Sequence, residues 1–345
     1  MKFKKDIDPL LKMEDAFERI DETPDSEYYK TDRFVQHLDS RALSTVTDVF
    51  ETLIIEENPK ILDLMASWDS HLPGRLKDTE VTGLGLNENE LKKNEALSDY
   101  ILHDINDNPE LPFDNERFDA VICTVSVDYM KKPVKVFREA ARVLKSGGIF
   151  IVVFSNRFFE QKAVKLWRES EEEDWIFIVK RYFELADEFE ESKDYVSVGK
   201  PRPEDDKYAP LGIPSDPVYA VYAEKPGQSL ERPDPMIVLR AGRDKQKVEE
   251  LKKRIVETHK CPYCDSEMKK WKVPDNPFYP TWDSEFLYIC FNDNCEYYLR
   301  GWDYMFISGN GRCSYRFMWD PGRDACHPIP VHTRKSLQSG IIEQG

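Results

Sequence analysis

The fold is decided by a stretch that begins Ile61-Leu62-Asp63-Leu64-Met65-Ala66-Ser67-Trp68, an apolar run followed by a short polar loop. Further apolar runs follow at residues 81–86, 100–104, 118–123 and 148–154. Short apolar runs separated by helical or loop spacers are typical of buried parallel strands in an α/β domain. Ligands of such sheets bind at the carboxyl ends of the strands, so the residues that end each run are candidates for a binding site.

Around the last two runs the chain contains Leu111-Pro112-Phe113, then Phe118-Asp119-Ala120-Val121, then Arg142-Val143-Leu144-Lys145-Ser146-Gly147-Gly148. This pattern resembles class I S-adenosylmethionine-dependent methyltransferases of the type 11-like group. The likeness covers about residues 15–190 and extends to a subgroup in which Leu-Met-x-Ser-Trp-x-Ser-His-Leu-Pro replaces the usual glycine loop. It implies an α/β fold with a Rossmann-like, seven-stranded methyltransferase sheet and leading helices.

The resemblance also implies that S-adenosylmethionine binds at the strand ends. Asp63 and Asp104 match the family's acids after the first and third strands. At the family's ribose-binding acid this chain has Gly85, and nearby Asn87 offers an uncharged amide. Trp68 either packs on the cofactor or fills space under the loop. The residues predicted to bind the cofactor are Asp63, Met65, Ala66, Ser67, Trp68, Gly85, Leu86, Asn87, Asp104, Ile105, Thr124, Val125 and Ser126.

The acceptor side is predicted less sharply. In such methyltransferases leading helices often cover the pocket, so Tyr28, Phe34 and Asp39 are candidates to line it, although ordinary helix packing is the favoured explanation for each single residue. Asp128 either faces the pocket or caps the next helix. No motif assigns a catalytic residue. The residues predicted to contact the acceptor are Tyr29, His37, Tyr129, Asn156 and Arg157.

Six of the seven cysteines lie after residue 260. The segments Cys261-Pro262-Tyr263-Cys264 and Cys290-Phe291-Asn292-Asp293-Asn294-Cys295 form two knuckles whose thiolates suit a tetrahedral structural zinc ion, as in a zinc ribbon. The predicted metal ligands are Cys261, Cys264, Cys290 and Cys295. Cys313, Cys326 and His327 are left as an open second possibility. The lone Cys123 lies in an apolar run and is predicted to be a buried small hydrophobe.

These patterns predict a helical lead-in (1–58), a methyltransferase-like domain (59–225), a Pro-rich linker with a helix at about 243–257 (226–258), a zinc-ribbon domain (259–330) and a tail (331–345). The net charge of −16 lies mainly before residue 240, which disfavours a nucleic-acid substrate. No apolar run reaches the length of a membrane span, and the N-terminus lacks the apolar core of a secretory signal, so we expect a cytoplasmic protein.

The sequence therefore predicts a methyltransferase whose acceptor is a small molecule or a protein. Two alternatives remain. The altered first loop and Gly85 favour a non-catalytic binding protein that uses the zinc ribbon to dock a partner. Aromatic residues and lysines in the ribbon, among them Trp271, Lys269, Lys270 and Lys272, are compatible with an RNA methyltransferase, although aromatics more often form the core of a small domain.

Overall fold

A computed structural model describes residues 7–76, 78–228, 230–235, 255–274 and 284–342. These residues form two compact units. The first holds residues 7–196 and 216–235. The second holds residues 197–215 together with the described residues from 255 onward. The segment 197–215 follows the sixth strand of the first unit but clusters with the second.

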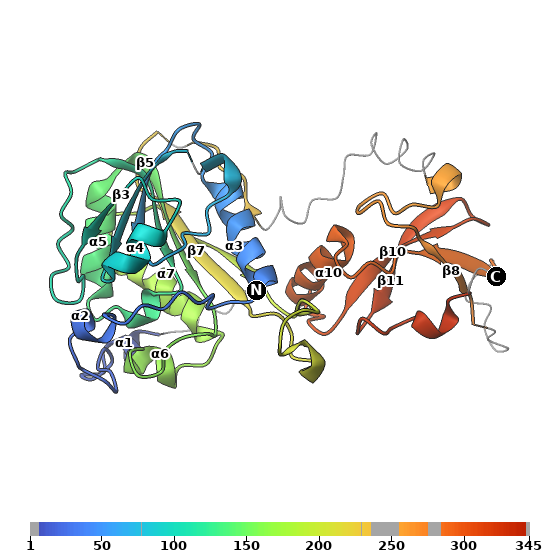
Figure 1. The fold of residues 1–345 in the computed structure, drawn as a ribbon, viewed down its shortest axis with the longest axis horizontal. Coiled ribbons are helices and arrows are strands. Elements are labelled where there is room, and N and C mark those ends of the chain that lie inside the picture. The colour runs from blue at the N-terminus through green and yellow to red at the C-terminus, as the bar shows by residue number, and fades with distance from the viewer. Residues whose placement is uncertain (1–6, 77, 229, 236–254, 275–283, 343–345) are drawn as a thin grey trace. The chain divides into compact units, whose positions relative to one another are not determined.

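The first unit is built on a mixed sheet of seven strands in the order β3-β2-β1-β4-β5-β7-β6 (Figure 1). β1 to β5 pair in parallel with their neighbours, whereas β7 runs antiparallel to β5. This topology confirms the predicted α/β, Rossmann-like methyltransferase sheet. The strands are β1 Lys60–Leu64, β2 Glu80–Gly85, β3 Asp99–Leu102, β4 Phe118–Thr124, β5 Leu144–Phe154, β6 Lys193–Ser197 and β7 Val218–Glu224.

The strand order places a crevice at β1. This strand pairs with β2 on one side and with β4 on the other, because the chain first builds the sheet in one direction and then returns to extend it in the other. A reversal of this kind opens a space beyond the carboxyl ends of the strands, where ligands of α/β proteins bind.

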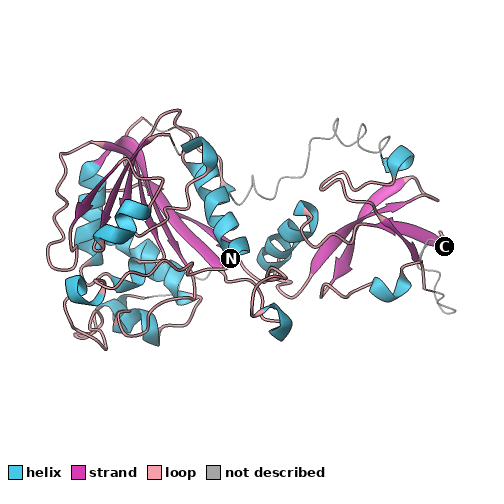
Figure 2. Ribbon diagram, viewed as in Figure 1, coloured by secondary structure: helices cyan, strands magenta, loops and turns pink. Residues whose placement is uncertain are grey.

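Helices cover both faces of this sheet (Figure 2). The helix α3 begins after Asp39, whose carboxylate accepts the N–H groups of Arg41 and Ala42, and it packs against β7. On the other face, the Phe137 ring of α5 lies 4.8 Å from Phe183 of α7 and 4.9 Å from Phe150 of β5. The helices are α1 Asp8–Leu11, α2 Asp25–Tyr28, α3 Ser40–Leu53, α4 Glu88–Lys93, α5 Pro133–Val143, α6 Lys165–Glu169 and α7 Asp174–Ala186.

Two local expectations need correction. The pair Gly147-Gly148 predicts the end of a helix that begins at Pro133. The helix α5 instead ends at Val143, because Leu144 already pairs with Phe118 and both glycines lie inside β5. Asp39 caps α3 instead of lining the pocket. The prediction for Cys123 is confirmed, since its side chain is buried within β4.

The second unit carries a four-stranded sheet in the order β11-β10-β9-β8, antiparallel throughout, with a helix packed on β10. Near the end of the chain Ile341 bridges Trp271 of β8. The segment 197–215 contributes Lys200, which pairs with the buried Asp303 at 3.1 Å. The elements are β8 Lys269–Lys272, β9 Phe286–Ile289, α10 Glu296–Ile307, β10 Ser314–Asp320 and β11 Ala325–Val331.

Most of the helix predicted at about 243–257 lies outside the described residues, as do parts of the linker, the ribbon and the tail. Residues 255–258 are helical. Within the described ranges, no helix combines the length and the apolar character needed to cross a membrane.

Candidate functional site

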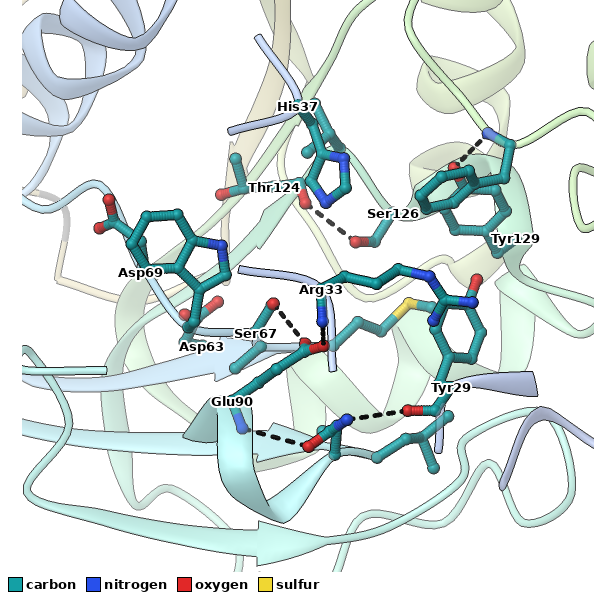
Figure 3. Close-up of a pocket in the computed structure, with 18 of the residues that line it drawn as sticks. Tyr29, Arg33, His37, Asp63, Ser67, Asp69, Glu90, Thr124, Ser126 and Tyr129 are labelled. Carbon is teal, nitrogen blue, oxygen red and sulfur yellow. Dashed lines mark hydrogen bonds between the residues drawn. The ribbon is translucent and has the colours of Figure 1, made fainter. Parts of the chain in front are cut away.

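A cavity of about 420 Å³ opens at the carboxyl ends of β1, β2, β3 and β4. Its volume lies in the range of small-molecule sites. The structure places every residue predicted to contact cofactor or acceptor in its lining, although these residues come from segments spread between Tyr29 and Arg157. Figure 3 shows how side chains from the lead-in, the strand ends and α4 face one another across it.

The loop after β1 adopts the geometry that a glycine usually provides. Met65 has φ 61°, in the left-handed region that favours glycine. The N–H of Ala66 donates to Leu84 O at 2.8 Å, which holds the loop against β2. A Cβ at Gly85 would lie 2.3 Å from Ala66 O, so no side chain fits at the end of β2. The absence of an acid there therefore follows from the close approach of the backbone.

Asp63 lies at the floor of the cavity, where its carboxylate accepts the Ser70 hydroxyl at 2.6 Å. Burial raises the pKa of Asp63 to about 7, although the bond from Ser70 opposes the shift.

The amide of Asn87 is already engaged. Its oxygen accepts the N–H groups of Asn89 and Glu90 at the start of α4, and its nitrogen donates to Asp32 and to Tyr29 O. The neighbouring Glu90 turns toward the cavity instead. Its Oε2 accepts a hydrogen bond from the Ser67 hydroxyl at 2.6 Å, and its Oε1 accepts one from the backbone N–H of Arg33 at 2.7 Å (Figure 3).

Beyond β3, Asp104 Oδ1 accepts the N–H of Asn106 at 2.9 Å, and the Asn106 amide donates to Asp25 Oδ2 at 2.9 Å. Asp25 pairs with Arg19 at 2.6 Å and with the fully buried Lys162 at 3.3 Å. This network ties the lead-in to the edge of the cavity near Asp104.

At the end of β4, Val125 has φ 45°, a strained conformation for a β-branched residue. Two buried hydroxyls of the cavity wall, Thr124 Oγ1 and Tyr29 Oη, have no hydrogen-bond partner among the described residues. Buried polar atoms are normally satisfied, so both are available to a ligand.

The lead-in covers the cavity through aromatic contacts. Tyr129 Oη accepts the Phe159 N–H at 2.7 Å, and the Phe159 ring lies 5.4 Å from His37 in a T-shaped contact. Burial, with His71 and Arg33 nearby, lowers the pKa of His37 and favours its neutral form. Trp68 lines the cavity and donates to Val35 O at 3.1 Å, so it also fastens the loop to the lead-in. Asn156 and Arg157 are exposed at the rim.

Sequence reasoning missed several lining residues, among them Asp25, Arg33, Glu90, His71 and Phe159. Glu90 could have been noticed, because it stands shortly after the second apolar run. Its position three residues after Asn87 is, however, equally typical of a residue that caps a helix. Nothing local indicated Arg33, which meets Glu90 only in the folded chain.

In the second unit, the Sγ atoms of Cys261, Cys264, Cys290 and Cys295 all lie within 4.8 Å of one another. The Cys261–Cys295 and Cys264–Cys290 distances are 3.8 and 3.6 Å. A tetrahedral metal with bonds of about 2.3 Å places its sulfurs about 3.8 Å apart, so the donor set fits zinc. Hydrogen bonds from Cys290 and Cys295 lower the pKa of the Cys261 thiol. Cys313, Cys326 and His327 form no such group in the described ranges.

Comparison with known proteins gives one family match. A family described as a methyltransferase domain matches residues 69–152, and it supports a class I methyltransferase. No curated protein matches the chain.

Solved structures resemble about half of the chain. A methyltransferase of Haloferax volcanii, solved with the Trm112 activator, is 17% identical, with 54% of this chain and 91% of that chain covered and a TM-score of 0.39. A SAM-dependent methyltransferase of Methanosarcina mazei is 16% identical, with coverage of 52% and 97% and a TM-score of 0.34. Haemonchus contortus phosphoethanolamine N-methyltransferase 2 is 16% identical, with coverage of 54% and 53% and a TM-score of 0.36.

Proposed function

We propose that the first unit binds S-adenosylmethionine in this cavity and transfers its methyl group to a small-molecule or protein-borne acceptor. The observation that carries the proposal is the convergence of the strand-end residues on one cavity beside a reversal of strand order. The left-handed Met65 supports it, because the loop keeps the close backbone approach of a glycine loop without the glycines.

The chain's own groups suit the parts of the cofactor. Asp104 and Ile105 lie where the adenine would bind, and Asp63 with the loop 65–68 lies near the centre of the floor. Thr124, Val125 and Ser126 would face the sulfonium, which supplies the methyl group. Methyl transfer is a displacement that depends mainly on positioning.

The acceptor would enter beside the lead-in. His37 has no hydrogen-bond partner among the described residues, faces the cavity, and is neutral at pH 7 because its pKa is lowered. A neutral imidazole can take a proton from an acceptor whose attacking atom carries one. Tyr29 and Tyr129 would border the acceptor, and Asn156 and Arg157 would meet it at the rim.

We further propose that the cysteine cluster of the second unit binds a structural zinc ion. All four positions around the metal would be thiolates, which leaves no open position for catalysis. Such a site requires reduced cysteines, in keeping with the predicted cytoplasmic location.

Calorimetric titration of the zinc-loaded protein with S-adenosylmethionine and S-adenosylhomocysteine tests the first proposal. We expect micromolar binding that Asp104→Ala, just beyond the end of β3, weakens at least tenfold. Asp99→Ala, at the exposed start of β3, should leave binding unchanged. No heat and no thermal shift at millimolar ligand would favour the non-catalytic binding protein instead.

A further inference from the structure

Arg33 brings a positive charge into the wall of the cavity without a negative partner. Its guanidinium donates only to two neutral carbonyl groups, Tyr28 O at 3.1 Å and Thr31 O at 3.4 Å. Among the described residues, no Asp or Glu forms an ion pair with it. A guanidinium carries five N–H donors and stays charged at physiological pH, so both charge and donors remain for a bound anion.

The acids of the cavity wall are engaged by other groups. Asp25 pairs with Arg19 at 2.6 Å. Glu90 accepts the backbone N–H of Arg33 and not its guanidinium. The remaining acids of the wall, Asp63, Asp69 and Asp104, accept hydrogen bonds from Ser70, His71 and Asn106. The protein therefore folds with this positive charge uncompensated, although its net charge is −16.

Aromatic rings surround the guanidinium. Its central carbon lies 4.9, 5.4 and 5.7 Å from the ring centres of Tyr28, Tyr29 and Phe159. In Figure 3 the side chain extends from the backbone beside Glu90 toward the ring of Tyr29. Ring faces attract a cation and hold it in place, and they keep water away from it. An anion that replaces the remaining water would therefore bind in a medium of low dielectric constant, where opposite charges attract more strongly.

Arg33 lies on the side of the cavity where the acceptor would enter. The Phe159 ring that it contacts also makes the T-shaped contact with His37, the candidate proton acceptor. One small molecule can therefore reach both groups. Arg157, exposed at the rim, adds a second positive charge to the entrance. The amino-acid end of S-adenosylmethionine fits the guanidinium less well, because its ammonium group lies beside its carboxylate and opposes the attraction.

We infer that the methyl acceptor carries an anionic oxygen group, a carboxylate or a phosphate, which pairs with the guanidinium of Arg33. This inference rests on the proposed function and narrows the class of acceptor. Pairing at Arg33 holds the acceptor by its charged end and leaves its nucleophilic atom free to approach His37 and the methyl group.

Calorimetry on the full zinc-loaded chain, saturated with S-adenosylhomocysteine, tests the inference. The probes are benzoate, phenyl phosphate and the neutral benzamide. We expect at least one of the two anions to bind tenfold or more tightly than benzamide, since hydrogen bonds to a charged group are strong. Comparison of the two anions distinguishes a carboxylate from a phosphate.

Arg33→Gln should reduce this preference to less than about threefold. Arg117→Gln is the matched control, because Arg117 also lies over two aromatic rings, those of Phe113 and Phe118 at 5.2 Å, but outside this cavity. It should keep the wild-type preference. If Arg33→Gln does not fold, Arg33→Lys keeps the charge without the planar fork and should still lower the preference at least about threefold.

Other outcomes overturn the inference. Equal binding of the anions and benzamide, or an unchanged preference in Arg33→Gln, would mean that Arg33 does not select an anion. If Arg33→Gln weakens S-adenosylhomocysteine tenfold but leaves 5′-methylthioadenosine, which lacks the amino acid, unchanged, Arg33 binds the carboxylate of the cofactor instead. Failure of the wild type to bind S-adenosylhomocysteine at all would contradict the proposed function itself.

Discussion

The two units maintain their structures by different means. In the first unit, central strands such as β4 and β5 bury continuous apolar runs, and Val121, Ile122 and Val152 are fully buried. In the second unit, Cys261, Cys290 and Cys295 themselves belong to the core, packed with Tyr298 and Trp302. The stability of the first unit should therefore respond to changes around its cavity, and that of the second to changes in its cysteine cluster.

The largest expected effect is loss of the cysteine cluster. Cys264→Ser, or a strong chelator, should unfold the second unit, because structural zinc supplies on the order of 10 kcal/mol to small domains. The first unit should keep its own thermal transition. Cys313→Ser, outside the cluster, is the control and should retain one bound zinc by elemental analysis. A single transition that chelation leaves unmoved would contradict a structural metal.

The next effect concerns the backbone contact in the first unit. Gly85→Ala should destabilise this unit by about 1–3 kcal/mol and weaken S-adenosylhomocysteine binding at least tenfold, since its Cβ would force Ala66 away. Gly74→Ala, with nothing within 4 Å of the added Cβ, should change neither quantity measurably. Calorimetry and urea unfolding measure both. If Gly85→Ala and Gly74→Ala had the same stability and the same affinity, the loop after β1 would be able to move away from an added Cβ at no cost.

A pH experiment tests the core of the first unit. Burial raises the pKa of Asp128 to about 8, so the folded state keeps a proton that the unfolded chain releases near pH 4. Its stabilising contribution is complete below about pH 4 and disappears as the pH rises toward 8. As the pH rises from 5 to 9, the free energy of unfolding of Asp128→Asn should therefore increase by more than about 2 kcal/mol relative to that of the wild type.

The pKa of Asp63 is also raised, to about 7. Its contribution to the pH dependence of stability is the same in the wild type and in Asp128→Asn, so it cancels when the two proteins are compared. Asp107→Asn, at an exposed position, is the control and should follow the wild-type pH curve. A constant offset between Asp128→Asn and the wild type would show that Asp128 is ionised throughout.

The smallest effect is expected at Met65. Its left-handed conformation costs about 1–2 kcal/mol for a non-glycine residue, whereas glycine adopts it freely but loses more entropy on folding. Met65→Gly should therefore lie within about 1 kcal/mol of the wild type, on the stabilising side. Ala66→Gly, without that strain, should be destabilising. Denaturant midpoints separate the two, and a strongly destabilised Met65→Gly would show that the side chain matters more than the backbone.

The sequence predicted the sheet because each strand is a separate apolar run that must be buried. It also predicted which residues line the cavity at the strand ends, because the carboxyl ends of parallel strands lie at one edge of the sheet irrespective of the side-chain contacts. It could not predict that Asn87 is engaged by the lead-in or that Glu90 meets Arg33, because those contacts join residues distant in the chain. Nor did it show that segment 197–215 packs with the second unit, since a Pro-rich loop has no hydrophobic periodicity from which its packing partner could be predicted.

The most direct test is a crystal structure of the zinc-loaded protein grown with S-adenosylhomocysteine. The account predicts the ligand in the cavity, with the adenine beside Asp104 and the sulfur facing Thr124 to Ser126. An empty cavity at saturating ligand, or the nucleoside bound elsewhere on the chain, would contradict the claim that this glycine-poor loop still forms a cofactor site.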